Sequence, residues 1–370
     1  MNILIDFTQI PIQKVGVGVY AKETFYRIVN QDKNNKYFCI IQNDDHELIN
    51  LFQTQKIIKV NSKIFRYFVF RVLLEQIYIP FLCLKYKIDI IHSLHYSFPI
   101  MKLSKTKRIV VVHDLTFFIY PKMHTLIKRY YFKIFIKLAC KYSDAIICVS
   151  KSTKNDLFRY VSNIKSEVHV IPLAANITTN YSGIDVKNKY SIKKDYLLFI
   201  GTLEPRKNIT QLIKAYSNIK DKEKLQLVIV GKKGWYYKEI FNLVDQLSLN
   251  NDIIFTGFAS DEDKFALLEN CYIFIYPSVY EGFGLPVLEA ITLGVPTITS
   301  NVSSMPEVVE DSAIKINPLD VNDIIKAIDL LSQDDQLREN LSKKGKTQSM
   351  KYSWDITAKE TVSLYNNILK

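Results

Sequence analysis

The sequence of 370 residues lacks the features that mark several large classes of protein. It has no run of about 18 uncharged apolar residues, and its most apolar region, 67–84, contains Arg71 and Glu75, which argues against a membrane-spanning helix. The start, Met-Asn-Ile-Leu-Ile-Asp, carries no basic segment or cleavage site, so we expect no signal peptide. Repeats and low-complexity tracts are absent too.

Cysteine is scarce and scattered. The five cysteines are odd in number and show no C-x-x-C spacing, which argues against a disulfide framework or a zinc site. We expect buried thiols in a reducing compartment. They are Cys39, Cys83, Cys140, Cys148 and Cys271.

Positive charge is in excess, and the excess lies in one half of the chain. The 49 Lys+Arg exceed the 37 Asp+Glu to give +12. Residues 1–175 hold 26 basic and 12 acidic residues (+14), whereas 176–370 hold 23 and 25 (−2). This asymmetry predicts an anionic partner for the first half, either nucleic acid or an acidic membrane surface.

Short, continuously apolar runs alternate with helix-period segments along the whole chain. Such runs are typical of parallel strands buried on both faces, so the pattern predicts an α/β protein with two doubly wound parallel-sheet domains. The expected strands are Asn2–Asp6, Tyr37–Ile41, Asp89–His92, Arg108–Val112, Asp144–Val149, Glu167–Ile171, Tyr196–Ile200, Leu225–Val230, Asp252–Thr256, Tyr272–Tyr276, Pro296–Thr299 and Ala313–Ile316.

The domain boundary is predicted in a polar segment without helix or strand periodicity. We expect a first domain over 1–172, a linker over 173–195 and a second domain over 196–352. Ser260, Asp320 and Ser353 precede helical patterns as N-caps.

The sequence of the segment 276–290 predicts a strand, a glycine-containing loop and a helix that begins near Pro286. Backbone N–H groups at such a helix start suit a phosphate. Glu281 in the loop is free to face a ligand, and Glu289 in the first turn can accept hydrogen bonds from sugar hydroxyls. The alternative is that the glycines only make a tight turn and both glutamates are solvated or cap the helix.

A second candidate segment follows the strand 196–200. Gly201 begins a loop that ends in Arg206 and Lys207, at the edge where α/β folds bind ligands. An Arg fork beside a mobile Lys charge suits a diphosphate, although two basic residues before a helix are usually solvated.

The first half holds weaker candidates. Gly16 and Gly18 follow the first strand but lack the third glycine of a dinucleotide fingerprint. His113 ends a strand, where it either caps a turn or faces a ligand. His92 and His95, also near a strand end, either face a ligand or pack in the interior.

A basic amphipathic helix is predicted over 128–142. Its cations recur every four residues, which suits an anionic membrane surface; the alternative is a helix docked on the sheet with its cations solvated. They are Arg129, Lys133, Lys137 and Lys141.

Together these motifs resemble the retaining glycosyltransferases of family 4, which have the two-domain GT-B fold with the domains facing a cleft. The resemblance covers nearly the whole chain. It rests on E-G-F-G-L-P-x-x-E (281–289), G-T-L-E-P-R-K-N (201–208), V-P-T-I-T-S-N-V-S-S-M-P-E-V (295–308) and the closing S-W (353–354).

The resemblance assigns roles to these residues. It implies catalytic roles for Glu281, His113, Lys207 and Arg206, with Arg206 and Lys207 on the donor diphosphate and Glu289 on the ribose. The first domain would be the acceptor side and the second the donor side, with the helix in 353–370 packing back on the first. The donor-binding set is Gly16, Gly18, Gly201, Arg206, Lys207, Thr256, Gly257, Phe258, Gly282, Phe283, Gly284, Leu285 and Glu289.

The activity implied is transfer of a hexose, mannose-type favoured, from a nucleotide-sugar with retention. No D-x-D motif ends a strand, so we expect no metal or other cofactor, and a GDP-sugar is favoured over a UDP-sugar. The acceptor would be polyprenyl-diphosphate-linked or an oligosaccharide in bacterial surface polysaccharide synthesis, used by a cytoplasmic enzyme peripheral on the inner face of the membrane. Alternatives are a GT-B epimerase or phosphorylase-like enzyme, or a nucleic-acid-binding protein, for which no recognised signature is present.

Overall fold

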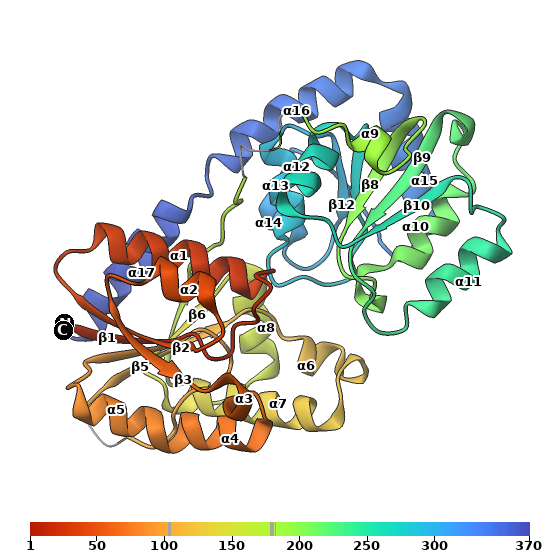
Figure 1. Cartoon of the computed structure of the whole chain (residues 1–370). Coiled ribbons are helices and arrows are strands. Elements are labelled where there is room, and N and C mark those ends of the chain that lie inside the picture. The colour runs from red at the N-terminus through yellow and green to blue at the C-terminus, as the bar shows by residue number, and fades with distance from the viewer. Residues whose placement is uncertain (103–104, 178–180, 182) are drawn as a thin grey trace. The chain divides into compact units, whose positions relative to one another are not determined.

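The computed structural model describes residues 1–102, 105–177, 181 and 183–370. The chain divides into two compact units, one formed by Met1–Leu173 with Ser353–Lys370 and the other by Ala174–Tyr352 (Figure 1). Residues 178–180 and 182 of the expected linker lie outside the described residues.

The first unit is built on a parallel sheet. Among its described residues seven strands pair in the order β3-β2-β1-β4-β5-β6-β7, so the strand order reverses between β1 and β4. The strands are β1 (Asn2–Asp6), β2 (Lys36–Gln42), β3 (Lys56–Val60), β4 (Ile90–Ser93), β5 (Lys107–Val112), β6 (Ala145–Cys148) and β7 (Glu167–Val170).

Helices cover both faces of this sheet. Helices α1, α2 and α17 lie over one face, and α3, α4, α5 and α7 lie over the other (Figure 1). The helical segments are α1 (Val17–Gln31), α2 (His46–Leu51), α3 (Ser62–Phe65), α4 (Phe68–Leu73), the π-helical turn η1 (Leu74–Tyr78), α5 (Ile79–Lys85), α6 (Thr116–Ile119), the 3₁₀ turn η2 (Pro121–Met123), α7 (Leu126–Tyr142), α8 (Lys151–Tyr160) and α17 (Trp354–Ile368).

The last helix, α17, belongs to the first unit although it follows the second unit in the chain. Asp355 accepts a hydrogen bond from Gln31 of α1 at 2.7 Å. The hydroxyl of Tyr365 lies 2.6 Å from Nδ1 of His92 on β4. Because both groups of the second contact are buried, α17 completes the interior of the unit.

The second unit has the same design. Its described residues form six parallel strands in the order β10-β9-β8-β11-β12-β13, with the reversal between β8 and β11. The strands are β8 (Asp195–Ile200), β9 (Leu225–Val230), β10 (Ile253–Gly257), β11 (Ile273–Tyr276), β12 (Thr297–Ser300) and β13 (Ile314–Ile316).

Helices α10, α11 and α15 cover one face of this second sheet, and α12, α13 and α14 cover the other (Figure 1). The helical segments are α9 (Val186–Lys189), the 3₁₀ turns η3 (Pro205–Lys207) and η4 (Lys222–Lys224), α10 (Ile209–Tyr216), α11 (Lys238–Gln246), α12 (Asp261–Glu269), α13 (Leu285–Thr292), α14 (Met305–Val309), α15 (Val321–Gln333) and α16 (Asp335–Ser349).

The twelve predicted strands are confirmed to within one residue at each end. The prediction missed β3, whose sequence K-I-I-K-V is half-exposed and lacks a continuous apolar run because it forms the edge of the sheet. The N-caps at Ser260, Asp320 and Ser353 are confirmed. The expected linker also contains the one-turn helix α9, capped by Asp185, which the periodicity did not reveal.

The cysteines are buried as expected, and in the described chain all five are free thiols. No helix within the described ranges is long and apolar enough to cross a bilayer.

Two glycines allow the loops after β8 and β9 to cross closely. A Cβ at Gly231, whose φ is +153°, would lie 1.9 Å from the carbonyl oxygen of Gly201. A Cβ at Gly234 would lie 2.7 Å from that of Leu203. Only residues without a side chain fit here, so the position of the loop 201–207 depends on them.

We predict that Gly231→Ala lowers the free energy of unfolding by about 3 kcal/mol or more, because backbone must move to admit the methyl group. Gly183→Ala is the matched control, since Gly183 also has positive φ (+85°) but nothing lies within 4 Å of its Cβ position. The control should lose about 1 kcal/mol. Calorimetry of the two variants measures the loss in free energy of unfolding for each. Equal losses would contradict the prediction.

Candidate active site

The candidate residues of the second unit lie where its strand order reverses. Arg206 and Lys207 follow β8, and Glu281 follows β11. These two strands are neighbours, and the carboxyl ends of parallel strands at such a switch point form the ligand-binding edge of α/β sheets. The backbone N–H of Val279 and the hydroxyl of Ser278 donate to the carbonyl of Arg206, both at 3.0 Å, which joins the two loops.

A buried carboxylate, Glu281, is the centre of this edge. Its Oε1 accepts hydrogen bonds from Nζ of Lys207 (2.7 Å), the hydroxyl of Ser278 (2.7 Å) and the hydroxyl of Tyr276 (3.1 Å). Its Oε2 pairs with the guanidinium of Arg206 at 2.7 Å. Both predicted cations therefore bind the predicted carboxylate, and Glu281 is only 8% exposed.

The electrostatics follow from burial and pairing. Burial raises the pKa of Glu281, but the Arg206 and Lys207 charges outweigh it and hold the pKa at about 2. Burial and the neighbouring Arg206 charge lower the pKa of Lys207, against the opposing effect of Glu281. At neutral pH the carboxylate is therefore fully ionised.

Arg206 is fixed by a second carboxylate that the sequence did not reveal. Glu204, 5% exposed, accepts from Nε and Nη2 of Arg206 at 3.1 and 2.7 Å. The Arg206 guanidinium also donates to the carbonyl of Tyr280 at 2.7 Å. Two cations thus face two carboxylates, and this local neutrality keeps the buried group stable without a ligand.

Serines after β12 hold the Glu281 loop in place, and these too were missed. Ser303 donates to the carbonyl of Glu281 at 2.5 Å and accepts from its N–H at 3.1 Å. Ser304 donates to the carbonyls of Glu281 and Phe283 at 3.0 and 2.8 Å. Both lie in the stretch 295–308, one of the motifs that carry the family resemblance.

Helix α13 begins directly after this loop. Gly284 is its N-cap with φ +104°, and a Cβ there would lie 2.2 Å from Cε of Met305. No side-chain hydrogen bond caps the helix, and Pro286 in its first turn has no N–H. This is the helix start that the sequence predicts for an anion.

The prediction that Glu289 lies in the first turn of the helix is wrong, because α13 begins at Leu285 and Glu289 falls in its second turn. Glu289 is buried and pairs with Nζ of Lys264 on α12 at 3.0 Å. Burial raises its pKa, partly offset by the Lys264 charge. Thr256 and Gly257 end β10, and Phe258 after them is 55% exposed. The remaining predicted donor residues, Gly201, Gly282, Phe283 and Leu285, lie in the two loops described above or at the start of α13.

The candidate residues of the first unit lie at the start of its first helix and in its interior. Gly16, with φ +51°, is the N-cap of α1, and Gly18 lies in its first turn against Lys14. Nε2 of His113 donates to the carbonyl of Leu94 at 2.9 Å, and the ring packs edge-on against Tyr20. Burial lowers the pKa of His113, which is therefore neutral at pH 7.

The predicted basic face of 128–142 is only partly exposed. On α7, Lys137 and Lys141 are exposed, whereas Arg129 and Lys133 are half-buried, with Nζ of Lys133 over the ring of Phe118 at 5.2 Å. The part of the chain that the structure describes holds no group of three or more His, Cys, Asp or Glu able to bind a metal ion.

Two family models match the chain. Residues 184–348 match "Glycosyl transferases group 1", and residues 36–178 match "Glycosyltransferase Family 4". The chain is 31% identical over 268 residues to the O-antigen chain mannosyltransferase B of Escherichia coli, a match that covers 70% of each protein.

Solved structures with the same fold include distant enzymes. Sucrose-phosphate synthase of Thermosynechococcus elongatus superposes with a TM-score of 0.79 at 20% identity, over 100% of this chain and 99% of that one. Anabaena Alr3699/HepE in complex with UDP and glucose superposes with a TM-score of 0.77 at 14% identity, over 99% of this chain and 100% of that one. The predicted family resemblance and the GT-B fold are confirmed.

The pairing at Glu281 makes stability depend on pH. Because its folded pKa, about 2, is below the ordinary value of 4.5, its contribution is complete above pH 4.5 and is lost as the pH falls toward 2. We predict that Glu281→Gln costs about 3 kcal/mol at pH 7 and far less near pH 2. Urea unfolding at several pH values tests this.

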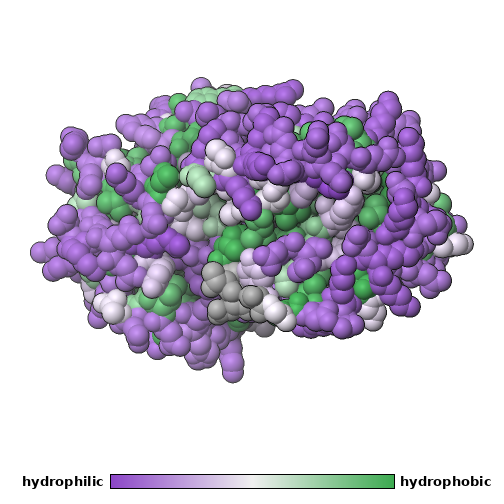
Figure 2. Space-filling model, turned by 90° about the horizontal axis from the view of Figure 1, so that it is seen from above, coloured by the Kyte–Doolittle hydropathy of each residue, from purple (hydrophilic) through white to green (hydrophobic). Residues whose placement is uncertain are grey.

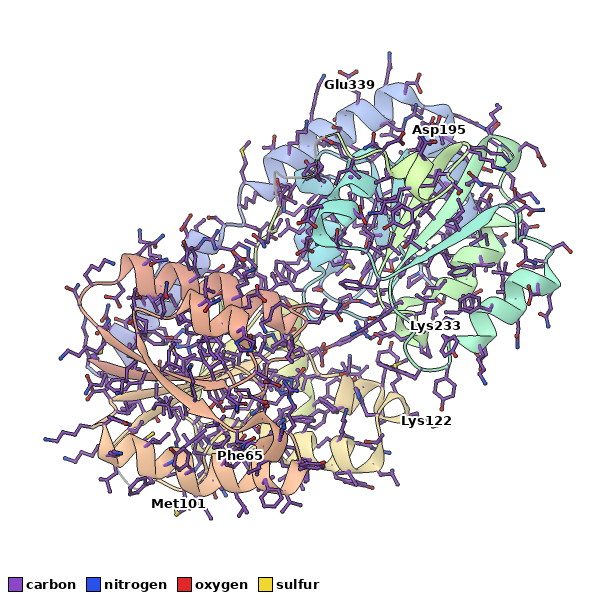
Figure 3. All side chains as sticks on the ribbon, in the orientation of Figure 1. Phe65, Met101, Lys122, Asp195, Lys233 and Glu339 are labelled. Atoms are coloured by element: carbon purple, nitrogen blue, oxygen red, sulfur yellow. The ribbon has the colours of Figure 1, made fainter. Side chains whose placement is uncertain are left out.

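The control for that measurement is Glu339→Gln. Glu339 is an exposed residue of α16 that pairs with Lys343 (Figure 3). Its loss should change stability little at any pH, since exposed ion pairs contribute little. A pH-independent loss in Glu281→Gln would show that its charge is not what stabilises the loop.

Proposed function

The chain belongs to the glycosyltransferases of family 4, and we propose that it transfers a hexose of mannose type from a nucleotide-sugar to an acceptor hydroxyl with retention of configuration. The cluster of Glu281, Arg206 and Lys207 beside the start of α13 carries this proposal. The mannosyltransferase activity in the name of the 31% identical relative supports the sugar.

The proposed chemistry follows from where charge develops. As the bond from sugar to diphosphate breaks, negative charge grows on the leaving group, and groups already oriented toward it stabilise the transition state most. Arg206, Lys207 and the N–H groups at the start of α13 are the proposed partners of the diphosphate, in place of a metal.

Glu281 fits a role close to the reacting sugar. It is ionised at neutral pH, so it can stabilise positive charge at the anomeric carbon as well as orient Lys207. Glu289 is proposed to accept hydrogen bonds from the ribose. From the first unit, His113, Gly16 and Gly18 remain the predicted contributors, and a GDP-sugar is the favoured donor.

We predict that Lys207→Ala and Glu281→Ala each lower kcat/KM by 10²-fold or more, a loss of about 3 kcal/mol in transition-state stabilisation. The assay measures release of GDP from GDP-mannose with an octyl glycoside acceptor, and NMR of the product reads the anomeric configuration. Lys343→Ala on α16 is the control and should keep full activity.

Unchanged turnover in both variants would contradict the assignment of the site. Donor turnover that needs no acceptor and gives no glycoside would instead indicate an epimerase or phosphorylase-like enzyme. Calorimetry of GDP binding and of UDP binding then shows which nucleotide base the donor carries.

The acceptor is proposed to be a lipid-linked or oligosaccharide intermediate of bacterial surface polysaccharide, reached from an anionic membrane surface. The first support is an exposed apolar stripe along the helical segment 68–85. Its side chains recur at helical spacing and are each between 46% and 55% exposed: Phe70, Leu73, Ile77, Phe81 and Leu84.

Helix α7 extends this stripe into one surface. The ring of Phe68 on α4 packs against Tyr131 of α7 with centroids 4.9 Å apart. Exposed apolar residues of α7, Leu126, Ile127 and Ile134, lie among its cations. Phe65 and Met101 are on the same side of the unit (Figure 3).

The opposite side of the first unit differs in character. Where α1 and α17 lie, hydrophilic residues cover most of the surface (Figure 2). An apolar stripe flanked by cations, including Lys63, Arg66 and Lys85, is the composition of a helix that lies in the interface of an anionic bilayer.

We predict that the protein sediments with vesicles of phosphatidylglycerol and phosphatidylethanolamine but weakly with phosphatidylcholine alone. The double variant Ile77→Ser with Phe81→Ser should bind about tenfold more weakly or worse. Burying a large apolar side chain contributes about 1.5–3 kcal/mol, and each substitution removes part of that contribution. Leu319→Ser in the second unit, where Leu319 is 69% exposed, is the control. Equal binding to all vesicles or by all variants would contradict the membrane proposal.

A further inference from the structure

The first unit has a buried polar cluster at its own switch point, where the strand order reverses between β1 and β4. Gln9 follows β1, Ser97 follows β4, and Glu75 lies in the π-helical turn η1 between α4 and α5. In the second unit the corresponding position holds the Glu281 cluster. π-Helical turns occur often at functional sites, and such an edge is where α/β sheets bind ligands.

Glu75 is the centre of the first-unit cluster and is only 2% exposed. Its Oε2 accepts from the hydroxyl of Ser97 at 2.6 Å and from Nε2 of Gln9 at 3.0 Å. Its Oε1 accepts from Nε2 of Gln76 at 2.8 Å. Gln9 also donates to Ser97 at 2.7 Å, so two side chains from distant segments, Gln9 and Ser97, converge on one carboxyl group.

The cluster mixes donors with an acceptor that has no partner. Arg71 lies one turn before Glu75, and its Nη2 is 3.4 Å from the hydroxyl oxygen of Ser97. Oε1 of Gln9 is buried and, within the described residues, makes no hydrogen bond; the same holds for Nδ1 of His95. A buried unpaired polar atom destabilises the folded protein, and a ligand with the right group would remove that cost.

The chemistry of the unpaired atoms selects the ligand class. The Gln9 oxygen needs a donor, and a phosphate dianion has only acceptor oxygens. Sugar hydroxyl groups both donate and accept, so they can bind Gln9 Oε1, Glu75 and Arg71 together. His113 lies close by, with its ring centroid 6.2 Å from that of His95.

We propose that Gln9, Arg71, Glu75 and Ser97 form the subsite that binds hydroxyl groups of the acceptor sugar beside His113. This inference rests on the proposed glycosyl transfer.

Burial raises the pKa of Glu75 to about 7, and Asp6 adds to this, while Ser97, Arg71 and Gln76 oppose it. Of the other groups facing the cluster, burial and Glu75 raise the pKa of Tyr131 to about 12, and burial lowers that of His95 well below its ordinary value. Both are therefore neutral near pH 7, and the pKa of about 7 places the titration of Glu75 there. Burial raises the pKa of Asp6 as well. Ionised Glu75 accepts a hydroxyl hydrogen bond more strongly than its protonated form.

The test is the steady-state kinetics of Glu75→Gln and Gln9→Ala with GDP-mannose and a panel of octyl glycosides as acceptors. We expect the acceptor KM to rise tenfold or more in each variant while the donor KM changes less than twofold. In the wild type the acceptor KM should fall as the pH rises from 6 to 8, and Glu75→Gln should lose this dependence.

Two controls separate the subsite from a structural effect. Glu23→Gln removes another buried carboxylate, which pairs with Arg27 on α1 at 2.7 Å, and should leave the acceptor KM unchanged. Glu75→Gln should keep a Tm at pH 8 equal to or above that of the wild type, because burial disfavours the charge it removes.

The outcomes distinguish this inference from the proposed function. If the wild type transfers mannose and both variants keep its acceptor KM, the subsite is overturned and the glycosyltransferase proposal stands. An equal rise in the acceptor KM of Glu23→Gln also overturns it. If the wild type transfers sugar to no octyl glycoside, the proposed transfer and the subsite both fail.

Discussion

The buried ion pairs of Glu281 with Arg206 and Lys207 are the interaction on which the second unit's ligand edge depends. A charge removed from water is stable only when it is paired and hydrogen-bonded, so the loops after β8 and β11 must meet at one carboxylate. Glu204 pairs with Arg206, and Ser303, after β12, binds the backbone of Glu281. The loops are thus held in place before any nucleotide enters, which lowers the reorganisation needed during the reaction.

The segment from Phe68 to Lys85 has two faces with different tasks. Its outward residues form the apolar stripe, while Arg71 and Glu75 point inward to the polar cluster at β1 and β4. A helix normally turns its apolar face toward the core, so the apolar character outside needs an explanation beyond folding. In the proposals above, one face rests on lipid and the other binds the sugar that the lipid carries.

Local pattern predicted the strands, the N-caps and the glycine loops, because each depends on residues close in sequence. Glu281, Arg206 and Lys207 could be placed at the ligand-binding edge because they follow the ends of predicted strands. The roles of Glu204 and Ser303 could not be predicted, because polar residues are common in loops and Ser303 lies 22 residues from its partner in the chain. In the sequence Glu75 is only a charge that interrupts an apolar run, and its partner Gln9 is 66 residues away.

The return of α17 to the first unit has a consequence for how the chain is made. During synthesis Ala174–Tyr352 leave the ribosome as a complete unit while the first unit still lacks its last helix. Until α17 has been synthesised and has packed, His92 lacks its contact with the Tyr365 hydroxyl. The face of the first unit next to α1 also stays uncovered. The second unit is thus free to fold before the first, although it comes later in the sequence, and the uncovered face is the part of the nascent chain most exposed to aggregation.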